Sequence, residues 1–375
     1  MKQKRFGMLL LLGVLGCVGQ NNHVPREFQQ HLKTLQYRYA PDLTLNVFDF
    51  SLERKDGRWV LRGETTVPEA KRAVEQMVDS LLGQEEVQKE VILLPHPRLG
   101  DSSFAVVRVG VANLREHPRH SAQLVDQAIM GNILRLLKQQ DGWFLVQTGY
   151  GYLGWMRKES FVRSDRRGVQ DWRDGPKVRV TALFAQVYRR PQESAVPVAS
   201  VVMNGWLRKI QTVQDWVEVQ LPDGRRGFIR KKHISEELNR YPIGDALRQA
   251  VVETAYRLMG TPYLWGGHSS VGSDCSGFTR TVFMANGISL PRDARQQALV
   301  GWEVQPEPDF SNLKPGDLLF FGAQDRITHV AISLGGTEYI HQSGDVHLNS
   351  LNPHSEIFNA YRLNTLKKIK RVLPE

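Results

Sequence analysis

The sequence contains very few cysteines, and this shortage excludes two classes of protein. Only Cys17 and Cys275 occur among its 375 residues. A scaffold held together by several disulfides is therefore excluded, as is a metal site built from several thiolates. Low-complexity tracts are also few and 41% of the residues are hydrophobic, so we do not expect a largely disordered chain. At about 100 to 200 residues per domain, the length predicts two to four globular units.

Long apolar runs are missing as well. The run at residues 8–15 is too short to cross a bilayer as a stable helix, and the basic residues before it indicate that residues 1–20 are an export signal. Its Val-Leu-Gly-Cys sequence resembles the bacterial lipobox, so Cys17 is a candidate lipidation site; the alternative is a plain secretory signal cleaved near residue 19 or 20. Both interpretations predict an exported protein, periplasmic or attached to a membrane through a lipid anchor. Both leave Cys275 as an unpaired thiol.

Acidic residues are outnumbered by basic ones, but the excess is spread out. The chain has 49 Lys and Arg against 39 Asp and Glu, a formal net charge of +10. The basic residues stand in short groups, which is typical of solvated faces, and no nucleic-acid partner is expected. A basic exported protein can still be attracted to anionic wall polymers or lipid headgroups.

Residues 24–95 predict a small α+β domain. A helix is expected over 25–39, strands over 43–52 and 59–63 with a turn between them at 55–57, and a second helix from Pro68, where proline suits the first turn. This domain weakly resembles the BON-type modules of exported bacterial proteins. It has no cluster of reactive side chains, so we expect it to serve as a spacer or docking domain.

The middle of the chain contains an internal repeat with a constant offset of 73 residues. Trp143, Val146 and Gly154 of the first copy correspond to Trp216, Val219 and Gly227 of the second. Each copy shows short alternating strands separated by turn residues, which suits a small antiparallel barrel. Both copies resemble bacterial SH3-like modules, expected at residues 100–170 and 176–238.

The last domain, residues 243–375, begins with a predicted amphipathic helix over 243–259. A glycine-ended loop and the sequence Ser-Asp-Cys-Ser-Gly follow, so that Cys275 opens another helix. The positive end of a helix favours a thiolate, and we therefore expect the Cys275 pKa to be lowered. The alternative is a buried, inert cysteine.

Two histidines on neighbouring predicted strands could supply the base. His329 lies on the strand 327–334, where it is expected to share a face with Ile327 and Ala331, and His341 lies on the strand that returns after Gly335-Gly336. A loop with an odd number of residues places His341 opposite Ala331 and diagonally next to His329, whereas a two-residue loop sends the two histidines to opposite faces. One imidazole could then take the thiol proton while the other orients it.

Other interpretations of the histidines are weaker. Cys275, His329 and His341 could together bind zinc, but their spacing matches no usual zinc motif, so no metal or cofactor is expected. The other histidines of this domain, His268, His347 and His354, have no partner pattern and are expected at the surface.

Six motifs in this order resemble the NlpC-type papain-like cysteine peptidases of bacterial cell-wall metabolism. They are Tyr-Leu-Trp-Gly-Gly, Asp-Cys-Ser-Gly-Phe, Leu-Pro-Arg-Asp, Leu-Lys-Pro-Gly-Asp, Thr-His-Val-Ala-Ile and Tyr-Ile-His-Gln-Ser-Gly, within residues 243–365. With two SH3-like modules upstream, the chain is similar to the YkfC-type γ-D-glutamyl-L-diamino-acid endopeptidases. The resemblance implies an α+β multidomain fold that ends in a papain-like peptidase domain.

The resemblance also implies roles for individual residues. Cys275 would be the nucleophile, His329 the base and His341 the orienting third member. The substrate groove would be lined by Tyr263, Trp265, Asp274 and Ser276, with Tyr152 reaching in from the first SH3-like module. An acidic residue of that module would help to bind the substrate ammonium; Glu116 is the candidate, while Gln123 stands where glutamate would be expected.

The implied reaction is hydrolysis of the bond between γ-D-Glu and the diamino acid, diaminopimelate or lysine, of murein peptides with a free N-terminal L-Ala. A barrel that caps the groove would leave room for one residue before the γ-D-Glu, and Tyr152 with Asp274 would bind its free amine. The alternatives are a hydrolase of intact wall stem peptides and a non-catalytic wall-binding lipoprotein.

Overall fold

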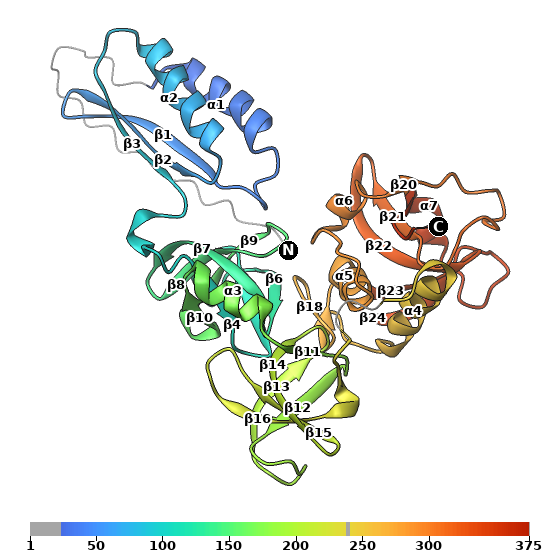
Figure 1. Ribbon diagram of the computed structural model, residues 1–375. Helices are drawn as coiled ribbons and strands as arrows, with labels where there is room; N and C mark the ends of the chain where they lie inside the picture. Colours follow the sequence, from blue (N-terminus) through green and yellow to red (C-terminus); the bar gives the residue numbers. More distant parts are fainter. Residues whose placement is uncertain (1–23, 238–240, 375) are drawn as a thin grey trace. The chain divides into compact units, whose positions relative to one another are not determined.

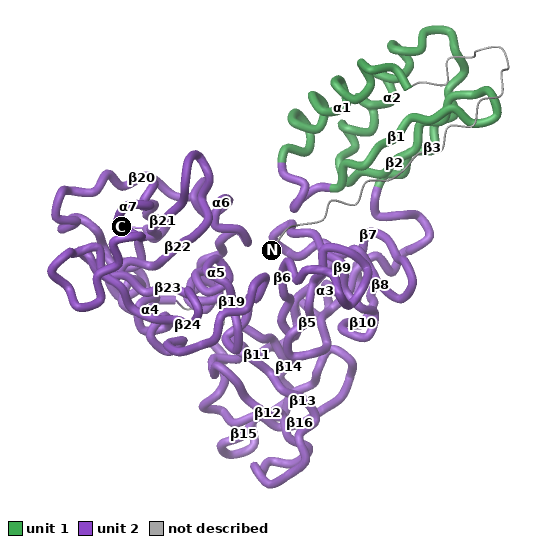
Figure 2. The backbone as a smooth tube through the Cα atoms, turned by 180° about the vertical axis from the view of Figure 1, so that it is seen from behind, with its two compact units in different colours: residues 1–41, 47–93 green, residues 42–46, 94–375 purple. Residues whose placement is uncertain are grey.

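The computed structural model describes residues 24–237 and 241–374. The expected signal and Cys17 lie outside these residues. The chain divides into two compact units, one of residues 1–41 and 47–93 and the other of residues 42–46 and 94–375 (Figure 2). Within the described ranges, no helix is both long and apolar enough to span a membrane.

The first unit is a three-stranded sheet with two helices (Figure 1). Its elements are α1 (Arg26–Tyr39), β1 (Phe48–Lys55), β2 (Arg58–Thr65), α2 (Pro68–Leu82) and β3 (Val87–Leu93). β1 and β2 form an antiparallel hairpin, and β3, which the sequence pattern did not predict, pairs in parallel with β2. The core holds Phe28 of α1, Val74 of α2 and Trp59 and Leu61 of β2.

The first strand begins later than expected. Residues 43–47 are not strand, because the side chain of Asp42 accepts hydrogen bonds from the backbone N–H and hydroxyl of Thr44 and so closes a turn. Residues 42–46 belong to the second unit, where Asp42 contacts Arg295 and Gln296.

The internal repeat is confirmed strand by strand. Each strand of the second copy begins 73 residues after its counterpart, as Lys177 does after Phe104. The first copy contains β4 (Phe104–Val107), β5 (Val111–Arg115), β6 (Leu124–Ile129), β7 (Ile133–Gln140), β8 (Trp143–Gln147), β9 (Leu153–Arg157) and β10 (Phe161–Ser164). The second contains β11 (Lys177–Val180), β12 (Phe184–Tyr188), β13 (Pro197–Val202), β14 (Trp206–Val213), β15 (Trp216–Gln220), β16 (Arg226–Arg230) and β17 (Ile234–Ser235).

The two copies also share their strand order. It runs β10-β4-β7-β8-β9-β5-β6 in one barrel and β17-β11-β14-β15-β16-β12-β13 in the other. Corresponding residues fill the two cores, as Val146 and Met156 do in the first and Val219 and Ile229 in the second. Helix α3 (Arg166–Asp174) connects the barrels. Short 3-10 turns lie at Pro97–Leu99, Lys158–Ser160 and Lys231–His233.

The last domain packs helices against an antiparallel sheet. Its helices are α4 (Gly244–Arg257), α5 (Cys275–Ala285), α6 (Ala294–Gln297) and α7 (Ala360–Thr365). The six-stranded sheet has the order β20-β25-β21-β22-β23-β24. Its strands are β20 (Trp302–Glu303), β21 (Leu318–Ala323), β22 (Arg326–Gly335), β23 (Glu338–Ser343), β24 (Asp345–Ser350) and β25 (Leu366–Arg371), and a two-stranded ribbon, β18 (His268–Ser269) and β19 (Gly272–Ser273), precedes α5. α5 packs on β22 and β23.

Candidate active site

Cys275 is the first residue of α5 and is held there by its neighbours. Asp274 caps the helix: its carboxylate accepts hydrogen bonds from the backbone N–H groups of Gly277 at 2.7 Å and Gly266 at 3.0 Å. A side chain at position 277 would meet the carbonyl oxygen of Gly267 at 2.0 Å, so only glycine permits this close approach. The loop and the start of α5 therefore form one fixed frame around the thiol.

The expected lowering of the Cys275 pKa is wrong. The side chain is 8% exposed, and burial together with the nearby Asp274 carboxylate raises the pKa of the thiol to about 11. The backbone of Val330 and Ser276 and the charge of Arg292 act in the opposite direction but are weaker. Burial dominates over the helix terminus. At neutral pH Cys275 is therefore a thiol in the resting protein.

This pKa has a measurable consequence for alkylation. In a Cys17→Ser chain, we expect the rate of Cys275 alkylation by iodoacetamide to rise about tenfold per pH unit from pH 7 to 10, because the thiolate fraction grows in that way below the pKa. The same chain in denaturant is the control, and its rate should level off at lower pH. A rate in the folded protein that is already constant below pH 7 would show a thiolate at rest and contradict the assignment.

An irregularity in the pairing of β22 and β23 brings the side chains of His329 and His341 together. β22 and β23 are joined by a two-residue turn, Gly336-Thr337, which alone would separate the imidazoles. A bulge between Ser333 and Gly335 restores the register, so that Ile332 pairs with Ile340 and His341 comes opposite Ala331. His329 Nε2 and His341 Nδ1 are 2.8 Å apart.

A second bulge lies at Thr328. Phe321 pairs with His329 and Gly322 with Ile327, which leaves Thr328 unpaired. The prediction that Ile327 shares a face with His329 and Ala331 is therefore wrong, because the bulge reverses the alternation. Ile327 packs instead with the core cluster that contains Cys275, and both Ile327 and Thr328 line the cavity at the thiol.

A chain of hydrogen bonds fixes the tautomers of His329 and His341. The amide nitrogen of Asn349 donates to the carbonyl oxygen of Ile357, so its Oδ1 faces His341 Nε2 at 3.0 Å and can only accept. His341 therefore carries its proton on Nε2 and accepts from His329 Nε2 through Nδ1. His329 Nδ1 is left without a proton, in the form required of a base.

Burial keeps both imidazoles neutral. It lowers the pKa of His341 to about 3, with the charges of His347 and Arg362 acting in the same direction, and it lowers the pKa of His329 well below the usual range. His329 is 6% exposed and His341 1% exposed. The hydrogen bonds from His329 through His341 to Asn349 require a neutral His341, because its Nδ1 atom must accept.

Two histidines expected at the surface have partners. His347 pairs with His341 across β23 and β24, with their Nε2 atoms 3.1 Å apart. His268 is 1% exposed and contacts Gln127 and Asp126 of the first barrel. Their strands, β24 and β18, were not predicted from the sequence. His354 is exposed as expected.

A cavity of about 420 Å³ lies beside Cys275 and is lined by residues of the last domain and of the first barrel. Most of the predicted groove residues line it: Tyr152, Tyr263, Trp265, Asp274 and Ser276. Gln123 also lines it. Glu116 does not; its side chain is 56% exposed and lies 3.9 Å from His117 Nε2.

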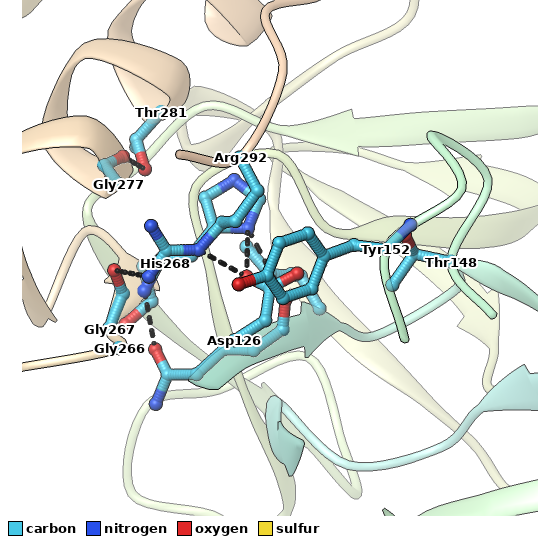
Figure 3. Close-up of polar contacts among 12 residues, drawn as sticks. Asp126, Thr148, Tyr152, Gly266, Gly267, His268, Gly277, Thr281 and Arg292 are labelled. Carbon is cyan, nitrogen blue, oxygen red and sulfur yellow. Dashed lines mark hydrogen bonds and ion pairs between the residues drawn. The ribbon is translucent and has the colours of Figure 1, made fainter. Parts of the chain in front are cut away.

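Asp274 is already paired. Both of its oxygens accept hydrogen bonds from the guanidinium of Arg292, at 3.1 and 2.7 Å. Arg292 also donates to Asp126 Oδ1 of β6 at 2.7 Å, and Figure 3 shows Arg292 and His268 reaching toward Asp126. All three charged groups are buried. Asp274 is thus paired with a buried cation. The expected contact between Asp274 and the substrate amine did not take this ion pair into account.

A different carboxylate faces Tyr152. The Tyr152 hydroxyl donates to Asp293 Oδ1 at 3.0 Å, and Asp293 lines the same cavity. Burial raises the pKa of Asp293, and Arg292 and Tyr152 oppose this. Asp293 also caps α6 and contacts Arg295. Sequence reasoning noticed the Leu-Pro-Arg-Asp motif but assigned no role to Arg292 or Asp293.

Metal binding gains no support from the side-chain arrangement. Among residues 24–237 and 241–374, no group of three or more His, Cys, Asp or Glu side chains is placed to hold a metal ion. The imidazole nitrogens of His341 face other imidazoles and an amide oxygen.

Comparison with known proteins gives two family matches, the NlpC/P60 family at residues 260–367 and the bacterial SH3 domain at residues 110–162. A protein named dipeptidyl-peptidase 6 from Lysinibacillus sphaericus is 29% identical over 274 residues, which cover 71% of this chain and 98% of that protein. A protein named gamma-D-glutamyl-L-lysine dipeptidyl-peptidase from Bacillus cereus is 29% identical over 230 residues, covering 58% of this chain and 67% of that protein.

A solved structure is similar over the same region. The crystal structure of an NlpC/P60 family protein from Bacillus cereus matches with a TM-score of 0.62 at 25% identity, covering 72% of this chain and all of that chain.

Proposed function

Because its last domain is a cysteine peptidase of the NlpC/P60 family and a bacterial SH3 domain precedes it, we propose that this protein hydrolyses the bond between γ-D-Glu and the diamino acid of murein peptides with a free N-terminal L-Ala. The coarser activity, a peptidoglycan-related endopeptidase, agrees with the name of the Bacillus cereus relative given above. The finer substrate is our proposal. It places the protein in turnover or recycling of wall fragments.

The proposal rests on one observation: Tyr152 of the first barrel lines the cavity at the thiol. Tyr152, which is 6% exposed, contributes its hydroxyl to the cavity at Cys275 and donates to Asp293 there. The phenol oxygen keeps lone pairs that can accept from an ammonium group, and the Asp293 carboxylate supplies the charge. A cavity that presents these two groups suits a short peptide that begins with a free amine.

The proposed reaction uses Cys275 and His329. The Cys275 thiol gives its proton to His329 Nδ1 as its sulfur attacks the carbonyl carbon at the γ position of D-Glu. The tetrahedral intermediate collapses when the imidazolium returns the proton to the leaving amine of the diamino acid, which leaves a thioester. Water, deprotonated by His329, then hydrolyses the thioester and restores the thiol.

The remaining residues have supporting roles in this proposal. His341 holds the ring of His329, and Asn349 in turn fixes the tautomer of His341. Tyr263 and Trp265 are partly exposed walls of the cavity, and Ser276 lies beside the nucleophile. Glu116 is outside the cavity lining, so we assign recognition of the amine to Tyr152 and Asp293 rather than to Glu116 or Asp274.

The activity is tested with defined peptides. L-Ala-γ-D-Glu-L-Lys and its diaminopimelate counterpart are incubated with the protein and with Cys275→Ala, and release of L-Ala-γ-D-Glu is followed by mass spectrometry. The proposal requires cleavage of at least one of the two peptides by the unaltered protein only. If neither is cleaved while the protein still sediments with purified sacculi, the wall-binding alternative is favoured.

Recognition of the amine predicts a strong effect of acetylation. Acetylating the L-Ala nitrogen removes a charge and adds bulk beside Tyr152 and Asp293, and we expect kcat/KM to fall roughly a hundredfold or more. Tyr152→Phe should cost less on the free peptide, since one hydrogen bond is lost and the ring remains. Asp293→Asn should reduce the preference for the free amine. Equal cleavage of both peptides would instead favour a hydrolase of intact stems.

For the location of the protein we propose export and lipid attachment at Cys17, on the basis of the lipobox-like sequence. Metabolic labelling with radioactive palmitate in a bacterial host tests this proposal. The unaltered chain should be labelled and should fractionate with membranes, and Cys17→Ser should do neither. Export without labelling would indicate a plain secretory signal.

A further inference from the structure

A second cavity, separate from the one at Cys275, lies between the two barrels and α5. Its volume is about 410 Å³, and it shares no lining residue with the active-site cavity. Elements of the first barrel, α3, the second barrel, β18 and α5 all contribute to its walls. Small-molecule sites in proteins have volumes of about 300 to 1,000 Å³, so the cavity is large enough for a ligand.

The charged side chains that line this cavity are all basic. Arg173, Lys177 and Arg280 line it, and no Asp or Glu does. The remaining walls include the indoles of Trp172 and Trp206. Asp174 lies near Lys177 and offsets part of its charge, and Lys177 also donates to the carbonyl oxygen of Trp172.

Arg280 is the unusual member of this lining. It is 3% exposed, and its Nε and Nη1 atoms are buried without a hydrogen-bond partner among the described residues. Its guanidinium lies over the ring of Tyr150, 3.6 Å from the centroid. Stacking on an aromatic ring replaces part of the lost hydration but supplies no acceptor for the N–H groups. A buried cation in this state is costly unless an anion pairs with it.

Two buried carboxylates of this region, Asp126 and Asp274, are committed to other groups. Asp126 accepts from Arg292 and from the hydroxyl of Tyr150. Asp274 is held by the same Arg292. The two negative charges of Asp126 and Asp274 equal the two positive charges of Arg292 and Arg280. Both carboxylates pair with Arg292, however, and in the parts of the chain that the structure describes Arg280 forms no ion pair within 4.0 Å.

We propose that this cavity binds a small organic anion whose carboxylate or phosphate oxygens pair with Arg280. A planar guanidinium matches the two oxygens of such a group, and the burial of Arg280 strengthens charge-assisted hydrogen bonds to it. Arg173 and Lys177 add attraction at the same cavity, and the two indoles provide apolar contact for the carbon skeleton. The proposal does not depend on the substrate of the active site.

The test measures binding of three probes by calorimetry and by thermal shift: glutarate, inorganic phosphate, and glutaramide as the uncharged analogue of glutarate. Glutarate, phosphate or both should bind and raise Tm, while glutaramide should not. Arg280→Gln should weaken anion binding at least tenfold. A preference for glutarate indicates a carboxylate ligand, and a preference for phosphate indicates a phosphate ester.

Two further variants separate the outcomes. Arg295→Gln changes a cation of the other cavity and should leave anion binding unchanged, whereas Lys177→Gln should weaken it even if Arg280→Gln folds poorly, as judged by circular dichroism. The proposal is overturned if neither anion binds at millimolar concentration, or if binding is the same in Arg280→Gln and Lys177→Gln as in the unaltered protein.

Discussion

Replacing Cys275 with alanine is expected to abolish peptide hydrolysis, with a loss of roughly four orders of magnitude or more in kcat. Removal of the thiol leaves no nucleophile, because the adjacent hydroxyl of Ser276 is bonded to Asp274 and Arg292. His329→Ala should be nearly as severe, since the proposed reaction passes the thiol proton to His329. Steady-state kinetics on the tripeptide measure both losses, with substrate binding by the Cys275→Ala variant as the folding control.

The supporting imidazole should behave differently from the base. His341→Gln is expected to retain more activity than His329→Ala, because an amide oxygen can accept from His329 Nε2 and hold its tautomer. Equal losses in the two variants would contradict these roles. Activity that disappears on adding a chelator would revive the zinc interpretation.

Asn349 extends the same chain of hydrogen bonds. Asn349→Leu should lower kcat about 10- to 100-fold with little change in KM, because His341 Nε2 loses an acceptor and the tautomer of His329 is no longer fixed. Asn349→Asp, which keeps an acceptor, should retain more activity. His347→Ala is the matched control, since His347 also contacts His341 Nε2 but is more exposed. A larger loss in His347→Ala would assign the support to His347 instead.

The second large effect concerns stability. Arg292→Met should destabilise the protein by about 3 to 5 kcal/mol, because it leaves the buried carboxylates of Asp126 and Asp274 without their cation. Arg157→Met, which breaks an exposed pair with Glu159, is the control and should cost much less. Chemical denaturation of both variants measures the difference.

The pH dependence of this loss identifies its cause. In the unaltered protein burial raises the pKa of Asp126, but His268 and Arg292 outweigh burial and hold it below the usual value. Its contribution to stability is therefore present at neutral pH and is lost as the pH falls through the lowered pKa. Without Arg292, burial should raise this pKa, so the deficit of the variant should shrink toward acidic pH as the carboxylate takes up a proton. A deficit that is constant with pH would point to lost packing.

Much of the fold and of the reactive centre could be predicted because the signals are local. The 73-residue repeat predicted two barrels with matching strands, and the Asp-Cys-Ser-Gly sequence placed Cys275 at the start of α5. The helices of the first domain were found within a residue or two of the expected positions. In each case spacing or a helix cap within a few residues carried the information.

The features that were missed depend on distant partners. Arg292 and Asp126 are 166 residues apart in the chain, so the sequence around either residue does not indicate their ion pair. The pKa of Cys275 depends on how deeply later strands bury it, which outweighs the local effect of the helix terminus. His347 was assigned to the surface because β24 had not been predicted, and its pairing with β23 brings it to His341.

The bulge between Ser333 and Gly335 also limits how this hairpin can change its length. While the two-residue turn and the bulge are kept, one residue added to or deleted from the paired part of either strand between His329 and His341 moves the second imidazole to the other face of the sheet, whereas a change of two residues returns it to the same face. Length variation here should therefore be tolerated in steps of two. The strands can grow or shrink during evolution without moving His341 to the other face only when that parity is kept, whereas the turn and the bulged residue are free of this limit.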